Sequence, residues 1–243
     1  MTYNVNYGLE GDPAGVAVLA DGWADMVLLQ ETTPTWERHL RSALGHVYPH
    51  MAFRHCCGAG GLAALSKHPF EERDYLPARA GWFPAWRLVF DSHLGPLQVL
   101  VVHLRPQISD TGSVLSGYFT TPAIREREIR EHFGALDPSL PTLVAGDFNE
   151  GPGGRALVFL KDRGLRSALG EFDTPQDTWR WPTSLGAVEM QLDHLAYDER
   201  LEPLDVQVRP VGRSDHWPVA GVFALRVGQG EPGSQADLLR SSY

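Results

Sequence analysis

The stretch PLQVLVVHL, residues 96–104, constrains the fold of this chain more than any other part of the sequence. It is strongly apolar and rich in β-branched valine, which is typical of a strand that is buried on both faces. Such a strand needs a neighbour on each edge and a covering layer on each face. The stretch therefore predicts a central strand inside a layered α/β protein.

Strand and helix patterns alternate along the rest of the chain. We expect strands at residues 2–7, 26–30, 47–54, 61–66, 85–91, 97–103, 142–146, 191–197, 204–209 and 219–226. We expect helices at residues 13–20, 34–44, 123–136 and 153–163, the first two capped by Asp12 and Thr33, each of which precedes a proline. Many short strands with a few interspersed helices favour packed sheets with the helices outside.

The C-terminal end differs in composition from the rest of the chain. Residues 1–227 contain the alternating patterns without a repeat or a long linker, and we expect one domain there. Residues 228–243 are rich in Gly, Ser and polar residues, which predicts a polar tail with a short helix at 235–241. Residues 105–122 form a long loop without a regular pattern, and loops of this length are often functional.

Composition and charge narrow the class of protein. With 43% hydrophobic and 21% charged residues, the chain of 243 residues can bury a sizeable core. Its net charge of −9 argues against tight, non-specific binding to duplex nucleic acid, which requires a basic surface. No apolar stretch is long enough to span a membrane, and the first residues lack the features of a signal peptide.

The two cysteines, Cys56 and Cys57, are adjacent in the sequence. Because a disulfide bond between neighbouring residues is strained, we expect two reduced thiols that pack beside a glycine-rich turn. Reduced cysteines favour a cytoplasmic location. The chain begins abruptly with a strand pattern, which leaves room for an upstream leader.

Three polar residues lie close to the first two strand patterns. Asn4 and Asn6 are two residues apart, so both amides would point to one face of a strand and could bind a metal or a phosphate oxygen. A capping role is the alternative for this pair. Glu31 follows a buried run, where a carboxylate needs a partner such as a divalent cation or a salt bridge.

Further polar residues follow the two most apolar strand patterns. His103 ends the central pattern, a position that suits a structural histidine as well as a catalytic one. Asp147 and Asn149 follow the run TLVAG, in which Gly146 releases the backbone. This strand could deliver a carboxylate and an amide to a reaction.

The C-terminal third adds two acids and a histidine in short motifs. Asp193 lies in QLDHLAY, and Asp215 and His216 are neighbours in RSDHWPV. Adjacent side chains point in different directions, so Asp215 can bind a metal while His216 does acid–base work. A histidine base needs a third group that fixes its tautomer, and Asp193 is a candidate for that role.

Taken together, the stretches YNVN, LLQET, VVHL, GDFN, QLDHLAY and SDHWPV resemble the endonuclease/exonuclease/phosphatase superfamily, which contains DNase I-like nucleases, AP endonucleases, inositol polyphosphate 5-phosphatases and neutral sphingomyelinases. The stretches span residues 3–219, and GDFN and SDHWPV are the specific ones. The resemblance implies a four-layered α/β sandwich, in which two mixed β-sheets pack face to face with helices outside (DNase I-like). It also places the active site at one edge of the sheets.

The same resemblance implies a reaction and a cofactor. The reaction is the hydrolysis of a phosphoester by an activated water, with Mg²⁺ or Mn²⁺ as the metal. The residues that the resemblance assigns to the metal are Glu31, assisted by Asn4 or Asn6 and by Asp215.

The remaining assignments concern acid–base groups and phosphate contacts. The resemblance implies that His216 is a base or a phosphate contact, oriented by Asp193. Asp147 orients or deprotonates the water, and Asn149 hydrogen-bonds a phosphate oxygen. Whether Asp147 or His216 is the base stays open at this point.

Three residues bear on the leaving group and on the substrate. His103 matches a histidine of the DNase I and phosphatase branches that protonates the leaving oxygen or holds the phosphate. Tyr118 matches a tyrosine of the AP endonuclease branch, with packing in the loop as the alternative. Arg105, just after His103, could contact an additional phosphate.

The substrate class stays open between two readings. The acidic charge and the short insertions favour a small or non-polymeric phosphoester. The alternative is a DNA or RNA nuclease with the same chemistry, in which Trp179, Trp181 and Trp217 could stack on bases, although core packing is the other role for them. A pseudoenzyme is a third reading, against which the intact acids and histidines argue.

Overall fold

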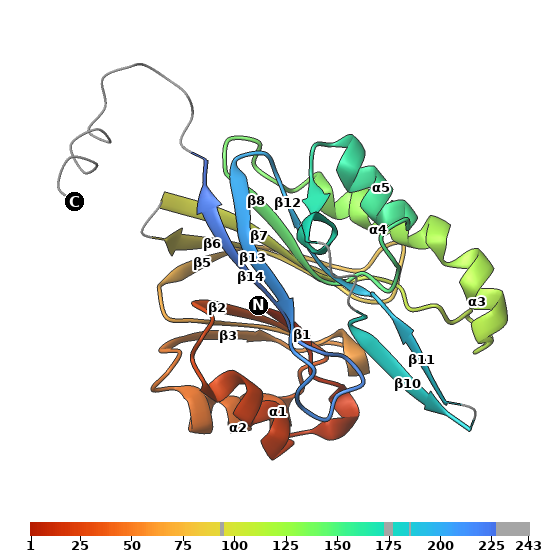
Figure 1. Cartoon of the computed structure of the whole chain (residues 1–243), viewed down its shortest axis with the longest axis horizontal. Coiled ribbons are helices and arrows are strands. Elements are labelled where there is room, and N and C mark those ends of the chain that lie inside the picture. Colours follow the sequence, from red (N-terminus) through yellow and green to blue (C-terminus); the bar gives the residue numbers. More distant parts are fainter. Residues whose placement is uncertain (93–94, 173–176, 185, 227–243) are drawn as a thin grey trace.

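The computed structural model describes residues 1–92, 95–172, 177–184 and 186–226. Two mixed six-stranded sheets pack face to face, and helices cover their outer sides (Figure 1). The predicted four-layered α/β sandwich is confirmed. The predicted tail at 228–243, with its short helix, lies outside the described residues. No helix among the described residues is long and apolar enough to cross a membrane.

The first sheet contains the two chain ends of the described body. Its strand order is β13 (Leu201–Val208), β14 (Val219–Leu225), β1 (Thr2–Asn4), β2 (Met26–Gln30), β4 (Leu62–Ser66) and β3 (His50–Arg54). Only the pair β1–β2 is parallel in this sheet. Helices α1 (Pro13–Ala20) and α2 (Pro34–Leu44) lie against its outer face (Figure 1).

The second sheet is built around the apolar run that the sequence marks as central. Its strand order is β5 (Phe70–Leu76), β6 (Ala85–Ser92), β7 (Gly95–His103), β8 (Thr142–Asp147), β12 (Asp193–Tyr197) and β9 (Arg166–Ser167). The pair β7–β8 is parallel, and the other pairs are antiparallel. Helices α4 (Pro122–Phe133) and α5 (Arg155–Asp162) cover the outer face of this sheet (Figure 1).

Strand β7 shows why this sheet needs two covering layers. Val99 and Val101 belong to the core between the two sheets, whereas Leu100 and Val102 belong to the core beneath α4 and α5. Successive side chains of a strand point to opposite faces, so a continuous apolar run fills both cores at once. The prediction of a central strand is confirmed.

The two capped helices also form as the sequence predicts. The side chain of Asp12 accepts a hydrogen bond from Gly15 N at the start of α1, and Thr33 accepts one from Trp36 N at the start of α2. These bonds satisfy backbone donors that the first helical turn leaves free. Trp36 is fully buried and fixes α2 on the sheet.

Several predicted boundaries are wrong. The expected loop 105–122 contains a helix, α3 (Val114–Thr120), which Ser113 caps. The helix expected from residue 153 begins at Arg155, because Gly154 is its extended N-cap. Strand β1 ends at Asn4, since Asn6 has a φ of 60° that no strand adopts.

Two further elements are absent from the sequence prediction. The edge strand β5 carries the charged run EERD, which hides its strand pattern. A separate two-stranded ribbon, β10 (Trp179–Thr183) and β11 (Gly186–Met190), projects from the body beside the open end of the sheets (Figure 1). Nearly all of its residues are exposed, so it lacks the alternating burial on which a strand prediction depends.

Gly146 ties the end of β8 to the neighbouring strand. Its φ is +146°, and a Cβ atom added there would lie 1.9 Å from Val102 O. The Gly146→Ala variant should therefore lose at least about 2 kcal/mol of unfolding free energy, because the strand must bend or separate from β7. Chemical denaturation measures this loss. Gly153→Ala is the matched control, since nothing lies within 4 Å of the added methyl group, and equal stability of the two variants would contradict the interpretation.

Buried His132 near the end of α4 should make stability depend on pH. Burial lowers the pKa of His132 to about 4, so the unfolded chain takes up a proton at a higher pH than the folded protein does. Stability should thus fall as pH drops from about 6.5 towards 4, by up to about 3 kcal/mol from this group. In His132→Asn, unfolding curves across this range should show a shallower fall, whereas substitution of exposed His46 should leave the fall unchanged.

Candidate active site

The candidate site lies at one edge of the sandwich, where strands from both sheets end. The parallel pair β1–β2 ends at Asn4 and beside Glu31, and the parallel pair β7–β8 ends at His103 and Asp147. Parallel strands bring their carboxyl ends to the same edge of a sheet. Strand β12 runs antiparallel to β8, so its first residue, Asp193, lies opposite Asp147 in the register.

Glu31 is held on the first sheet by two hydrogen bonds. Its Oε1 accepts from Asn4 Nδ2 at 3.0 Å, and its Oε2 accepts from Tyr7 N at 3.0 Å. Glu31 itself has a φ of 65°, a left-handed conformation that turns the side chain out of the strand. Burial raises the pKa of Glu31, although the bonds from Asn4 and Tyr7 oppose this shift.

The two N-terminal asparagines reach the site by different routes. Asn4 Nδ2 also lies 3.2 Å from Asp147 Oδ2, so it joins the two sheets. Asn6 caps a 3₁₀ helix, η1 (Tyr7–Leu9), and its Nδ2 donates to Asp215 Oδ1 at 2.8 Å. The expected placement of both amides on one strand face is therefore wrong, because the strand ends between them, yet both face the acids.

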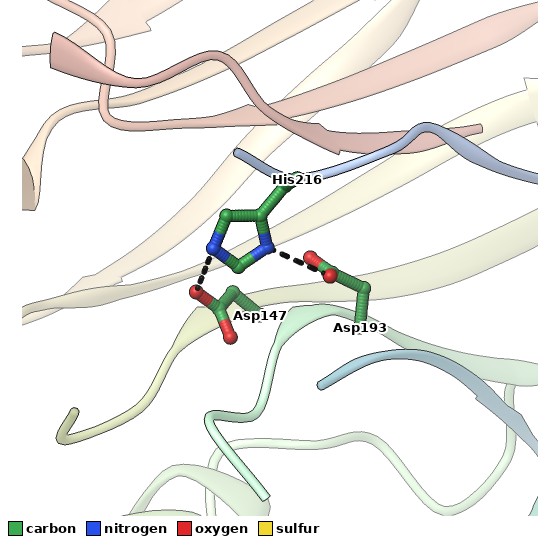
Figure 2. A group of neighbouring side chains, drawn as sticks. All are labelled: Asp147, Asp193 and His216. Carbon is green, nitrogen blue, oxygen red and sulfur yellow. Dashed lines mark hydrogen bonds and ion pairs between the residues drawn. The ribbon is translucent and has the colours of Figure 1, made fainter. Parts of the chain in front are cut away.

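His216 lies between two carboxylates (Figure 2). Its Nδ1 is 2.8 Å from Asp193 Oδ2, and its Nε2 is 3.6 Å from Asp147 Oδ2. Burial by itself would lower the pKa of His216, but the charges of Asp193 and Asp147 outweigh this effect and raise the pKa to about 10. The imidazole is therefore a cation at neutral pH, held in orientation by Asp193.

Asp147 is buried at the centre of the cluster. Burial raises its pKa to about 6, against the opposing charge of His216. Its Oδ1 accepts a hydrogen bond from Asn149 N at 2.8 Å. Asn149 adopts a positive φ of 53°, and its Nδ2 donates to Leu104 O at 3.0 Å. An amide has two N–H donors, so this bond leaves a second one for a ligand.

His103 faces the same acids from β7. Its Nε2 lies 3.5 Å from Asp147 Oδ2 and 4.0 Å from Glu31 Oε1. Its Nδ1 lies 3.2 Å from Ala59 O, and because a carbonyl only accepts, Nδ1 carries a proton. The ring stacks on Phe83 with centroids 4.3 Å apart, and burial lowers the pKa of His103. Nε2 is the atom available to a substrate.

The two predicted substrate contacts lie farther out. The guanidinium group of Arg105 donates to Ile108 O and Asp110 Oδ1 and stacks 3.3 Å from the ring centroid of Trp82. The structure does not bring Arg105 into the acid cluster, so its phosphate contact stays a prediction. Tyr118 on α3 is 58% exposed. It lines a cavity of about 580 Å³ whose wall includes Gln107, and Gln107 donates to Asn149 O.

The expectation of two reduced cysteines is wrong. Cys56 and Cys57 form a disulfide bond, and Cys57 adopts the left-handed conformation at the turn before Gly58. The positive φ of this residue lets neighbouring sulfur atoms meet. A cytoplasmic location therefore loses the support that reduced thiols would have given it.

The sequence analysis does not predict two residues that support the acids of the site. Thr178 Oγ1 donates to Asp193 Oδ2 at 2.7 Å, and Trp179 Nε1 donates to Asp215 Oδ2 at 3.0 Å. Thr178 precedes the unexpected ribbon and Trp179 begins it. No local motif in the sequence indicates that either residue bonds an acid.

The charge of the cluster fits a divalent cation. Among the described residues, no lysine or arginine forms an ion pair with Glu31, Asp147, Asp193 or Asp215. Buried carboxylates need a counter-charge, and His216 provides only one. One group that could hold a metal is Asp147, Asp193 and His216, whose ligand atoms lie within 4.8 Å of one another. Glu31 and Asp215 are two further carboxylates of the cluster, and each accepts a hydrogen bond from a neighbouring amide, Glu31 from Asn4 and Asp215 from Asn6.

The pKa of His216 tests this geometry directly. The Asp193→Asn variant removes the charge 2.8 Å from Nδ1, so the pKa of His216 should fall by about 1–3 units. An NMR pH titration of the metal-free protein measures this shift. Asp198→Asn, which removes a carboxylate at the far end of β12, is the control. An unchanged titration of His216 in Asp193→Asn would contradict the assigned pairing.

Comparison with known proteins agrees with the fold. A model of the Endonuclease/Exonuclease/phosphatase family matches residues 1–216. No curated protein matches this chain.

Solved structures share the fold at low sequence identity. An endonuclease/exonuclease/phosphatase from Beutenbergia cavernae is 19% identical, with a TM-score of 0.73 over 92% of this chain and 70% of that one. D. rerio TDP2 complexed with single strand DNA product is 16% identical (TM-score 0.67; 92% and 97% covered). Beta toxin 275-280 from Staphylococcus aureus is 17% identical (TM-score 0.63; 91% and 98% covered).

Proposed function

Because the chain belongs to the Endonuclease/Exonuclease/phosphatase family, we propose that it hydrolyses a phosphoester with an activated water at the cluster around Asp147. The observation that carries the proposal is the pair Asp193–His216, which presents an oriented imidazolium to Asp147. Asn149 and His103 lie beside the same carboxylate, where they would contact the phosphate and transfer a proton, respectively.

A divalent metal completes the site in this proposal. Glu31 and Asp215 would hold it, because carboxylate oxygens are ligands that Mg²⁺ and Mn²⁺ prefer. Asn4 and Asn6 would join them through Oδ1 only after their amides turn, because Oδ1 of Asn4 accepts from Asn6 N and Oδ1 of Asn6 accepts from Gly8 N. The metal supplies positive charge to the phosphate and to the attacking water. The alternative group, Asp147, Asp193 and His216, is less suited, because Asp193 already occupies Nδ1 of His216.

The raised pKa values of Asp147 and His216 favour one assignment of the acid and base roles. Asp147, with a pKa near 6, is a base that is ionised and still accepts a proton near neutral pH. His216 stays protonated and contacts the phosphate, while Asp193 fixes its orientation. To hold the phosphate or to deliver a proton to the leaving oxygen from Nε2, His103 must be doubly protonated, a form that the carboxylate of Asp147, 3.5 Å from Nε2, favours and that burial opposes. Asn149 donates its free N–H to a phosphate oxygen.

The substrate that we favour is a small or non-polymeric phosphoester. A net charge of −9 repels a polyanion outside the metal site. Nuclease activity on DNA or RNA is the second candidate, and the exposed tryptophans of the ribbon are the observation in its favour. The similar proteins do not decide between them, since one was solved with a DNA product and another is a toxin.

Metal-dependent hydrolysis is the test of the proposal. With bis(p-nitrophenyl) phosphate and Mg²⁺ or Mn²⁺, Glu31→Ala and His216→Ala should each lower kcat at least about 100-fold, because each removes a group at the reacting phosphate. EDTA should abolish the activity. Glu189→Gln, which changes an exposed acid on the ribbon, is the control. Full activity of either site variant, or full activity in EDTA, would overturn the proposal.

A substrate panel separates the two candidate functions. It contains p-nitrophenyl phosphate, plasmid, abasic duplex, RNA, inositol phosphates and sphingomyelin. A nuclease should prefer a polymer and lose binding steeply as salt rises. Preference for a small ester with a shallow salt dependence would support the favoured function.

A further inference from the structure

The ribbon β10–β11 is joined directly to the segment that carries the catalytic histidine. Arg180 N donates to Asp215 O at 2.8 Å, and Trp217 N donates to Thr178 O at 2.7 Å. These bonds flank an isolated bridge between Trp179 and His216. The ribbon is therefore a continuation of the site wall, and it projects from the body of the molecule (Figure 1).

The two faces of the ribbon differ in chemistry. Residues that lie opposite each other share a face, and Trp179 pairs with Met190 while Trp181 pairs with Val188. This apolar face contrasts with the other one, where Arg180 faces Glu189 and forms an ion pair at 3.5 Å. The ribbon is thus amphipathic, although none of the three apolar cores formed by the described residues includes its apolar face.

That apolar face is open to solvent. Trp181 is 55% exposed and Val188 is 47% exposed. Neither Trp179 nor Trp181 belongs to any of the three apolar cores among the described residues. A single exposed tryptophan is ordinary, but this one lies on a surface that leads without interruption into a charged site. Core packing therefore does not account for Trp181.

The two indoles form a stack that begins at the candidate metal ligands. Trp179 Nε1 donates to Asp215 Oδ2, which fixes the inner ring. Trp181 stacks on it with centroids 6.2 Å apart and an interplanar angle of 13°. The outer ring is therefore held in a defined plane, one stacked ring away from Asp215. A rigid flat ring binds another flat ring with little loss of side-chain entropy.

We propose that Trp181 is a stacking platform for the planar nucleobase of a substrate whose phosphate lies at the acid cluster. The proposal rests on the proposed function for the phosphate position. Charge favours a small ester over a polymer, because Arg180 is paired with Glu189 and the chain carries a net charge of −9. The coplanar indoles favour a ring over a lipid chain, which has no flat face.

Equilibrium binding tests the platform without requiring turnover. The probes are adenosine 5′-monophosphate, which has a planar base, and glycerol 3-phosphate, which has none. Trp181→Ala should weaken binding of adenosine 5′-monophosphate about tenfold in calorimetry and leave glycerol 3-phosphate unchanged. Trp181→Phe should retain most of the affinity, whereas Trp181→Leu, which is apolar without being flat, should behave like Trp181→Ala.

The control for this experiment is Trp23→Ala, which removes another exposed tryptophan, 43% exposed, in the turn before β2. It should change neither affinity. Equal loss of both probes in Trp181→Ala, or wild-type affinity in Trp181→Leu, would overturn the proposal. So would loss of phosphatidylcholine vesicle binding in Trp181→Ala with intact nucleotide binding, because the face would then take a lipid.

Kinetics separates this proposal from the proposed function. Thymidine 5′-(p-nitrophenyl phosphate) and methyl p-nitrophenyl phosphate share a leaving group, and the second ester group is a nucleoside in the first and a methyl group in the other. Trp181→Ala should lower kcat/KM about tenfold for the thymidine ester alone, and an equal effect on both esters would contradict stacking. If neither ester is hydrolysed, the proposed function fails, while the binding experiment still decides the role of Trp181.

Discussion

The buried carboxylate of Asp147 is the interaction on which the rest of the site depends. By register it lies beside His103 on one strand and Asp193 on the other. It also accepts a hydrogen bond from Asn4, which belongs to the opposite sheet. An unpaired carboxylate at this depth would be very costly, so every neighbouring strand ends in a donor, a cation or a candidate metal ligand.

The sequence predicts the layers well because the physics of the strands is local. The run 96–104 alternates between two cores, and proline after Asp12 and Thr33 marks two helix starts. The polar motifs at the strand ends, when they are considered together, also predict that these ends meet at one edge of the sheets. Distances between those side chains depend on how the sheets pack, which no local pattern contains.

The errors have identifiable physical causes. In helix α3 and in the ribbon, most of the residues whose burial is described are exposed, so neither shows the periodic burial on which a sequence prediction relies. Asn6 leaves the strand through a positive φ that asparagine tolerates, a choice that composition does not reveal. Cys56 and Cys57 were expected to be reduced on the basis of average geometry, whereas the left-handed turn at Cys57 brings their sulfur atoms together.

The hydrogen bond between Asn4 and Asp147 crosses from one sheet to the other. Asn4 belongs to the first sheet and Glu31 follows its strand β2, whereas His103, Asp147 and Asp193 belong to the second sheet. A slide of one sheet past the other by the length of a single bond would separate these groups while leaving every strand ladder intact. The geometry of the proposed site consequently depends on the alignment of the two sheets, and it should be lost before the secondary structure is.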